Sequence, residues 1–200
     1  MYEFIQHYGL DIATTLLGVI YIVFEYRASI WLWPVGVLMP LLNIFLFYDR
    51  GLYADMSMSV YSTLAALYGF LLWRFGKKKE QAERPITHIP WRSLSIATVA
   101  FLTIWAVIYY LLAHYTNSTV PMTDSFTNAL EIVGLWALAR KYVEQWFIWI
   151  LMDAVATVLY FYKDMPFKGT LYAAYVIIAV AGYREWLRKM HTEQQTTTAI

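Results

Sequence analysis

The sequence predicts an all-α membrane protein with seven transmembrane helices, and three observations support this prediction. Hydrophobic residues make up 60% of the 200 residues and charged residues only 14%, whereas a soluble domain carries roughly 25% charged residues. Apolar stretches of roughly 17 to 25 residues, long enough to cross a bilayer, recur along the chain. Lysine and arginine collect in alternate loops, as the positive-inside rule describes.

Each expected span is a mostly apolar stretch bounded by polar or charged residues. The first and fifth spans are the shortest, and flanking residues such as Glu25 and Arg140 can lengthen them by snorkelling to an interface. The second span contains Pro40, whose freed backbone carbonyl could kink the helix or line a cavity. The expected spans are residues 9–24, 30–48, 56–75, 93–115, 125–139, 146–162 and 169–186.

The loops between these spans indicate the orientation in the membrane. With the N-terminus outside, 12 of the 15 Lys and Arg residues fall on the inner side, and only Arg50, Lys163 and Lys168 fall on the outer side. This asymmetry favours an odd number of spans and a C-terminus in the cytoplasm. Residues 76–92 are then a basic cytoplasmic linker, and the polar, Thr-rich residues 191–200 are expected to form a disordered tail.

The sequence also contains an internal similarity between its first and second halves. Three residues recur 116 positions later and three others recur 114 positions later, so that spans one to three match spans five to seven: Gly18, Tyr26, Trp33, Phe47, Tyr48 and Tyr61 match Gly134, Tyr142, Trp149, Phe161, Tyr162 and Tyr175. Moving four spans along the chain restores the original direction, so this predicts a parallel 3+1+3 repeat with the substrate site between the halves. The alternative is chance, because 17 Tyr, 11 Phe and 9 Trp make some matches inevitable.

The domain organisation follows from this repeat. The first three-helix repeat is expected at residues 1–75 and the second at residues 116–190. The basic linker and a connector helix at residues 93–115 join them.

The strongest candidate binding residues lie in the sixth span. Trp146, Trp149 and Asp153 are spaced i, i+3, i+7, which places all three on one face of a helix. A carboxylate at membrane depth costs roughly 3 kcal/mol on insertion scales and persists mainly beside a cavity or a partner. Two indoles beside it suit a flat cation, which is stabilised over an indole by about 0.5 to 2 kcal/mol. The alternative is that the tryptophans form an interfacial belt.

Other polar or aromatic residues inside the spans are further candidates for binding. Glu131 lies midway along the fifth span and Asn43 in the second, and either residue could instead make a hydrogen bond between helices. Tyr61 and Tyr175 match each other in the repeat, as Trp33 matches Trp149. Each tyrosine could contribute a hydroxyl to the pathway or simply pack between helices.

Several other classes of protein are excluded or disfavoured. A primary pump needs a nucleotide site, yet the chain lacks a G-x-x-x-x-G-K-[ST] motif. Its four histidines are scattered near span ends and it has no cysteine, which disfavours a metalloenzyme. The net charge of +1 gives no indication of nucleic-acid binding. We therefore expect a carrier, not an enzyme, with no metal and no cofactor.

The chain resembles the PnuC family of bacterial vitamin transporters over nearly its whole length. The resemblance rests on three motifs and on the expected 3+1+3 arrangement. These motifs are Trp-x-x-Trp-x-x-x-Asp at Trp146 to Asp153, Asp-Ser-Phe-Thr with Leu-Ala-Arg-Lys in the fifth span region, and Gly-Tyr-Arg-Glu-Trp ending at Trp186. The motif in this family usually ends in Asn, where this chain has Asp153.

The resemblance implies a function. Members of this family take up nicotinamide riboside across the bacterial inner membrane by facilitated diffusion, and a cytoplasmic kinase traps the product. A related branch carries thiamine, and both vitamins are cationic heteroaromatics. The resemblance leaves a homo-oligomer open. A substrate-binding sensor or an energy-coupling subunit without transport of its own is the alternative, since binding and transport need similar sites.

Overall fold

The structure is a computed structural model that describes residues 17–49, 51, 53–76, 85–116, 118–162 and 166–198. The described residues form seven helices, and the only extended pairing among them is an isolated bridge between Thr87 and Tyr142. The prediction of an all-α protein is therefore confirmed. The chain divides into two compact units, residues 1–77 and 78–200. Residues 9–16 of the first expected span and residues 77–84 of the basic linker lie outside the described residues.

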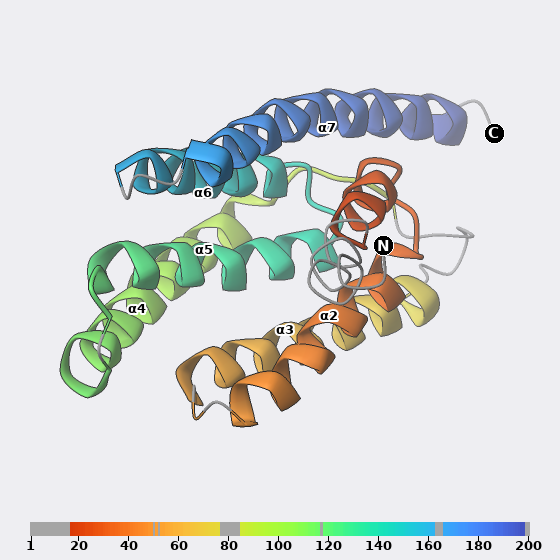
Figure 1. The fold of residues 1–200 in the computed structure, drawn as a ribbon. Helices are drawn as coiled ribbons and strands as arrows, with labels where there is room; N and C mark the ends of the chain where they lie inside the picture. The colour runs from red at the N-terminus through yellow and green to blue at the C-terminus, as the bar shows by residue number, and fades with distance from the viewer. Residues whose placement is uncertain are drawn as a thin grey trace, which may run out of the picture. The chain divides into compact units, whose positions relative to one another are not determined.

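The first unit contains the helix Leu17–Tyr26, α2 (Leu32–Asp49) and α3 (Tyr53–Phe75), and α2 packs along α3 (Figure 1). Hydroxyl side chains make α3 unusually polar for an apolar helix. The hydroxyls of Ser62 and Thr63 donate to carbonyls four residues earlier. Because these polar groups are satisfied inside the helix, they are compatible with a membrane span.

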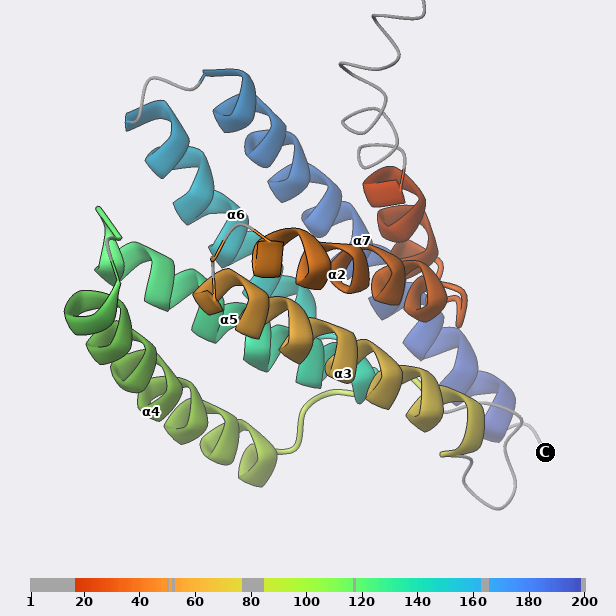
Figure 2. The ribbon, with the colours of Figure 1, turned by 60° about the horizontal axis from the view of Figure 1, so that its bottom comes forward.

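The second unit contains α4 (Trp91–Tyr115), α5 (Pro121–Ala139), α6 (Gln145–Tyr162) and α7 (Pro166–Thr198). Each of these helices packs on the next one along the chain, most extensively α6 on α7 (Figure 2). Pro121 occupies the first turn of α5, where a missing N–H leaves no hydrogen bond unmade. The result is a stack in which α5 and α6 form the interior and α4 and α7 the flanks.

Among the described residues, four helices are long and apolar enough to cross a membrane: α2, residues Met56–Phe75 of α3, α4 and α6. The fifth expected span lies within α5, which at 19 residues is long enough but is not apolar enough, because it carries Asp124 and Glu131 among several hydroxyl and amide side chains. The prediction of a disordered tail at residues 191–200 is wrong for residues 191–198, because α7 continues as a helix to Thr198. Its last turns are stabilised by hydrogen bonds, including one from the Thr192 hydroxyl to the Arg188 carbonyl.

A short segment of the second unit, residues 86–89, is held by hydrogen bonds to the loop between α5 and α6 and to α7 of the same unit. We call this arrangement the linker clasp. Thr87 exchanges backbone hydrogen bonds with Lys141 and Val143. The Glu144 carboxylate accepts the Ile89 N–H at 2.9 Å and contacts the His88 ring at 2.6 Å. The Glu193 carboxylate of α7 accepts the Ile86 N–H at 3.1 Å. Both carboxylates therefore satisfy backbone donors of a segment that has no helix of its own.

Equivalent contacts occur within each of the two units, at positions that differ by a constant 113 residues. In the first unit Trp33 packs edge-on against Trp73, with ring centroids 5.5 Å apart, and covers Gly69. In the second unit Trp146 packs edge-on against Trp186 at 5.9 Å and covers Gly182. Ala66 and Ala179, each 3% exposed, follow the same separation. The helix-to-helix turns also match, because the backbone hydrogen bonds of residues 27–33 recur one for one in residues 140–146.

This separation differs from the 116 and 114 residues expected from the sequence. In the structural register Trp33 matches Trp146 instead of Trp149, and Ser62 instead of Tyr61 matches Tyr175. The sequence comparison aligned rings with rings in a chain that is 18% aromatic. Such matches place helices approximately but do not fix their register.

Candidate functional site

The structure separates the two tryptophans of the α6 motif by their surroundings. Trp146 is 2% exposed and wedged between Gly182 and Trp186 of α7. Its indole N–H is buried and has no hydrogen-bond partner among the described residues. Trp146 therefore joins α6 to α7, and no open face of its ring is available in this conformation.

Trp33 has the same surroundings in the first unit. It is 1% exposed, covers Gly69 and contacts the edge of Trp73. The structure thus gives both Trp33 and Trp146 a role in packing helices.

Trp149 is only half-buried, and its ring lies against α5. A Cβ atom added at Gly134 would lie 2.6 Å from Cη2 of Trp149, so the indole rests on the glycine backbone. Trp149 and Asp153 are four residues apart on α6, and residues at this spacing lie on the same face. The half-exposed indole and the carboxylate therefore lie one above the other.

Asp153 lies at the middle of the 18-residue α6 and is 7% exposed. Tyr172 and Tyr175 of α7 lie near it. The rings of Tyr172 and Tyr160 stack with centroids 5.1 Å apart, which brings their hydroxyl groups to the same region. Asp153 therefore faces a cluster of phenol groups, which can share hydrogen bonds with it or with a ligand.

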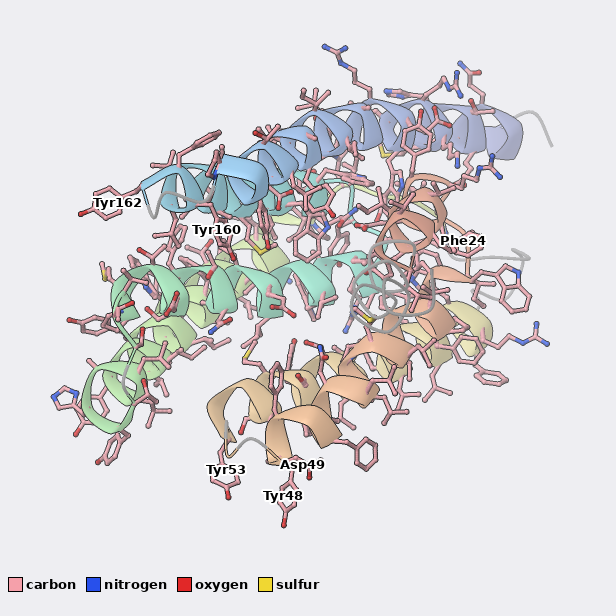
Figure 3. All side chains as sticks on the ribbon, viewed as in Figure 1. Phe24, Tyr48, Asp49, Tyr53, Tyr160 and Tyr162 are labelled. Carbon is pink, nitrogen blue, oxygen red and sulfur yellow. The ribbon has the colours of Figure 1, made fainter. Side chains whose placement is uncertain are left out.

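The sequence prediction included Tyr175 but missed Tyr160 and Tyr172. Tyr172 and Tyr175 are three residues apart on α7, so they lie on one helix face. That spacing was readable in the sequence, whereas the stacking of Tyr172 on Tyr160 of α6 depends on helix packing. Figure 3 shows Tyr160 and Tyr162 near the C-terminal end of α6, where Tyr162 is 84% exposed.

Glu131 is half-buried on α5, three residues before Gly134. Because residues at this spacing share a helix face, Glu131 lies near the place where Trp149 meets α5. The second unit thus places Trp149 and Asp153 on one face of α6, Glu131 on the face of α5 that carries Gly134, and Tyr175 on α7.

The remaining predicted residues, Asn43 on α2 and Tyr61 on α3, are half-buried in the first unit. Tyr61 matches Ala174 in the 113-residue register, so it is not the counterpart of Tyr175. Within the ranges that the structure describes, no three His, Asp or Glu side chains gather as a metal site would require.

Comparisons with known proteins agree with this picture of an apolar helical chain. Residues 8–188 match the family described as nicotinamide mononucleotide transporter. The riboflavin/roseoflavin transporter RibM of Streptomyces davaonensis is 31% identical over 179 residues, which cover 88% of this chain and 83% of that protein. The nicotinamide riboside transporter PnuC of Escherichia coli is 24% identical over 166 residues, 71% of this chain and 70% of that protein.

A solved structure shows the same fold. The crystal structure of the vitamin B3 transporter PnuC superposes with a TM-score of 0.65 at 22% identity, covering 88% of this chain and 79% of that one. These similarities identify a transporter and not an enzyme, and the apolar helices make it a multi-pass membrane protein. The chain belongs to the nicotinamide mononucleotide transporter family, whose relatives named here carry vitamins.

Proposed function

We propose that this protein carries a flat heteroaromatic vitamin precursor into the bacterial cell by facilitated diffusion. The observation that supports this proposal most is the placement of Asp153. It is a 7% exposed carboxylate at the middle of an apolar helix, one turn from the half-buried ring of Trp149. A carboxylate at that depth has a large desolvation cost, which a bound cation or hydrogen-bond donor offsets.

The binding residues we propose in the second unit are Trp149, Asp153, Glu131 and Tyr175. In the first unit we propose Asn43 and Tyr61 as further candidates. Trp149 stacks on the ring of the substrate. Asp153 balances a ring charge or accepts a hydrogen bond from an amide or ribose group.

Three candidate substrates follow from two different observations. The buried Asp153 favours a cation, and nicotinamide riboside is our first candidate, with thiamine as the other cationic vitamin. Riboflavin, a neutral tricycle, is the second candidate, because the relative with 31% identity is named a riboflavin/roseoflavin transporter.

We further propose a 3+1+3 arrangement of two parallel repeats, with α4 as the connector. The repeated turns, the Trp33 and Trp146 contacts and the constant 113-residue separation support it. Alternating access would then come from one repeat rocking against the other.

The distribution of basic residues supports an outside N-terminus and a cytoplasmic C-terminus. With that orientation, four exposed tyrosines all fall at helix ends on the outer side, where they would form an interfacial belt: Tyr48, Tyr53, Tyr115 and Tyr162. Figure 3 shows Tyr48 and Tyr53 at the same end of the first unit. The linker clasp falls on the inner side, together with most of the basic residues.

Downhill transport by itself cannot concentrate a vitamin. We therefore propose a functional link to a cytoplasmic kinase that phosphorylates the product and retains it. The location that fits is the bacterial inner membrane. A homo-oligomer is compatible with this role but is not needed for it.

Flux into liposomes made with purified protein alone tests the proposal. We expect labelled nicotinamide riboside to equilibrate across the membrane, with or without an imposed proton or sodium gradient. Accumulation several-fold above the outside concentration would overturn facilitated diffusion. Binding without flux would instead support the sensor or energy-coupling alternative, and liposomes containing Trp149→Ala protein provide the matched control.

A further inference from the structure

At one pair of matching positions, an aromatic residue and a glycine are interchanged between the two units. In the second unit the Trp149 ring on α6 covers Gly134 on α5. The structurally matching positions in the first unit, 113 residues earlier, are Gly36 on α2 and Tyr21 on the helix Leu17–Tyr26. There the ring belongs to Tyr21, and a Cβ at Gly36 would lie 2.9 Å from its Cε2.

At a second pair of matching positions, the aromatic residue and the glycine are not interchanged. Trp33 covers Gly69 and Trp146 covers Gly182, with the tryptophan on the same helix in both units. Packing at the exchanged position therefore needs one ring and one glycine, but the ring can come from either helix. In the second unit it comes from α6, the helix that also carries Asp153, whereas the position matching Asp153 in the first unit is Pro40.

The depth of the Trp149 ring depends on the absence of a side chain at residue 134. Cη2, Cζ3 and Cζ2 of the indole would lie 2.6, 2.9 and 3.1 Å from a Cβ there. Carbon atoms in comfortable contact are about 3.5 to 4.0 Å apart, so a methyl group would push the ring away from α5 by about 1 Å. The half-exposed side of the indole would move by the same amount.

We propose that Gly134 is a positioning residue that sets how far the Trp149 ring stands out from α5, and thereby the width of the ring that the carrier accepts. This inference rests on the proposed function, because it requires Trp149 to contact the substrate. With glycine at residue 134 the indole is fully withdrawn and leaves room for a wide ring. A larger residue would advance the indole and favour a narrow one.

The test compares dissociation constants of riboflavin and nicotinamide riboside for purified variants. Gly134→Ala is expected to weaken binding of the three-ring vitamin more than binding of the one-ring vitamin, changing the ratio of the two constants by about tenfold. Trp149→Phe, whose shorter ring no longer reaches α5, is expected to change the ratio in the opposite direction. The Gly134→Ala/Trp149→Phe double variant should return towards the original ratio.

Gly182→Ala is the matched control. It introduces the same methyl group against Trp146, which is fully enclosed. It is expected to lower the melting temperature in detergent and leave the ratio unchanged. If Gly134→Ala does not fold, Trp149→Phe alone carries the test, and an unchanged ratio in that variant overturns the positioning role.

The possible failures are distinguishable. If the unmodified protein binds neither vitamin, or if Trp149→Ala binds normally, the proposed site and this inference are both wrong. If Trp149→Ala loses binding but Gly134→Ala behaves like Gly182→Ala, only the positioning role is wrong. If just one vitamin binds, the Gly134→Ala defect in its affinity should be rescued by Trp149→Phe, and a defect that is not rescued overturns the inference.

Discussion

Ala28 and Lys141 are the two non-glycine residues of the described chain with a positive φ, 51° and 55°, and they lie 113 positions apart. Each follows the end of a helix and makes the same hydrogen bonds. Ala28 N–H donates to the Glu25 carbonyl and Lys141 N–H to that of Leu138, while the next N–H in each case reaches back five residues. This is the Schellman pattern, in which glycine is the usual residue. The same left-handed turn therefore occurs at matching positions of the two units.

The first prediction concerns this turn. A left-handed conformation costs an L-residue roughly 1 to 2 kcal/mol, and a β-branched side chain suffers most. Ala28→Val is therefore expected to lower the free energy of unfolding by about 2 kcal/mol, whereas Ala28→Gly should leave it unchanged or slightly raised. Thermal unfolding in detergent measures both. Equal stability of the two variants would contradict the assigned turn.

A second prediction concerns the ring-on-glycine contact of the first unit. A methyl group at Gly69 would overlap the Trp33 ring, and Trp33 is almost fully enclosed. Gly69→Ala should therefore cost about 1 to 3 kcal/mol of stability, the usual range for overpacking. Adding Trp33→Phe should recover part of that loss, because a smaller ring vacates the space. A double variant less stable than either single variant would contradict this packing.

These contacts mark the limit of what the sequence could predict. Hydrophobic runs were enough to locate both ends of five helices, α2 to α6, to within a few residues, since bilayer thickness sets span length. The register between the repeats could not be obtained that way, because Trp33 could be aligned with Trp149 as easily as with Trp146. Only the Gly69 and Gly182 partners, distant in sequence, decide between them.

The sequence likewise predicted some residues of the candidate site and missed others. Asp153 and Trp149 were recognisable from cost and spacing on a single helix. Trp146 fits the same spacing, yet it is enclosed by residues of α7 that no local pattern identifies. Tyr160 and Tyr172 were missed because their stacking joins two helices.

A third prediction tests the proposed ring contact. Trp149→Ala should weaken substrate binding by about 1 to 2 kcal/mol, roughly 5- to 30-fold, while membrane insertion stays normal. Trp146→Phe is the control, and it should reduce stability more than affinity because that indole is enclosed. Isothermal titration on purified protein provides both affinities. Unchanged affinity in folded Trp149→Ala protein would remove this residue from the site.

A fourth prediction separates charge from shape at Asp153. Asparagine has nearly the same size but no charge. Asp153→Asn should weaken binding of a cationic vitamin by about 1.5 to 3 kcal/mol, the range for hydrogen bonds to charged groups. A neutral analogue with its ring reduced should lose much less. Equal losses for the cation and its neutral analogue would show that Asp153 binds a hydroxyl or amino group instead.

The fifth prediction concerns the linker clasp. Glu144→Ala removes the acceptor of the Ile89 N–H and the contact with His88. Because the pair is partly exposed, the loss of stability should be small, about 1 kcal/mol. Amide hydrogen exchange at Ile89 should nevertheless become faster, while exchange within α6 stays unchanged. Glu144→Gln keeps an acceptor oxygen and should show a smaller effect, so equal exchange in both variants would argue against the clasp.

The short sequence distance between the partners in the first unit has a consequence for biosynthesis. Tyr21 meets Gly36 and Trp33 meets Gly69 and Trp73, so these contacts close within residues 1–77. Chains emerge from the ribosome N-terminal end first, and domains generally fold as units during synthesis. The first three helices can therefore reach their packed arrangement before the second unit has been translated. Their assembly does not have to wait for a partner that is still inside the ribosome.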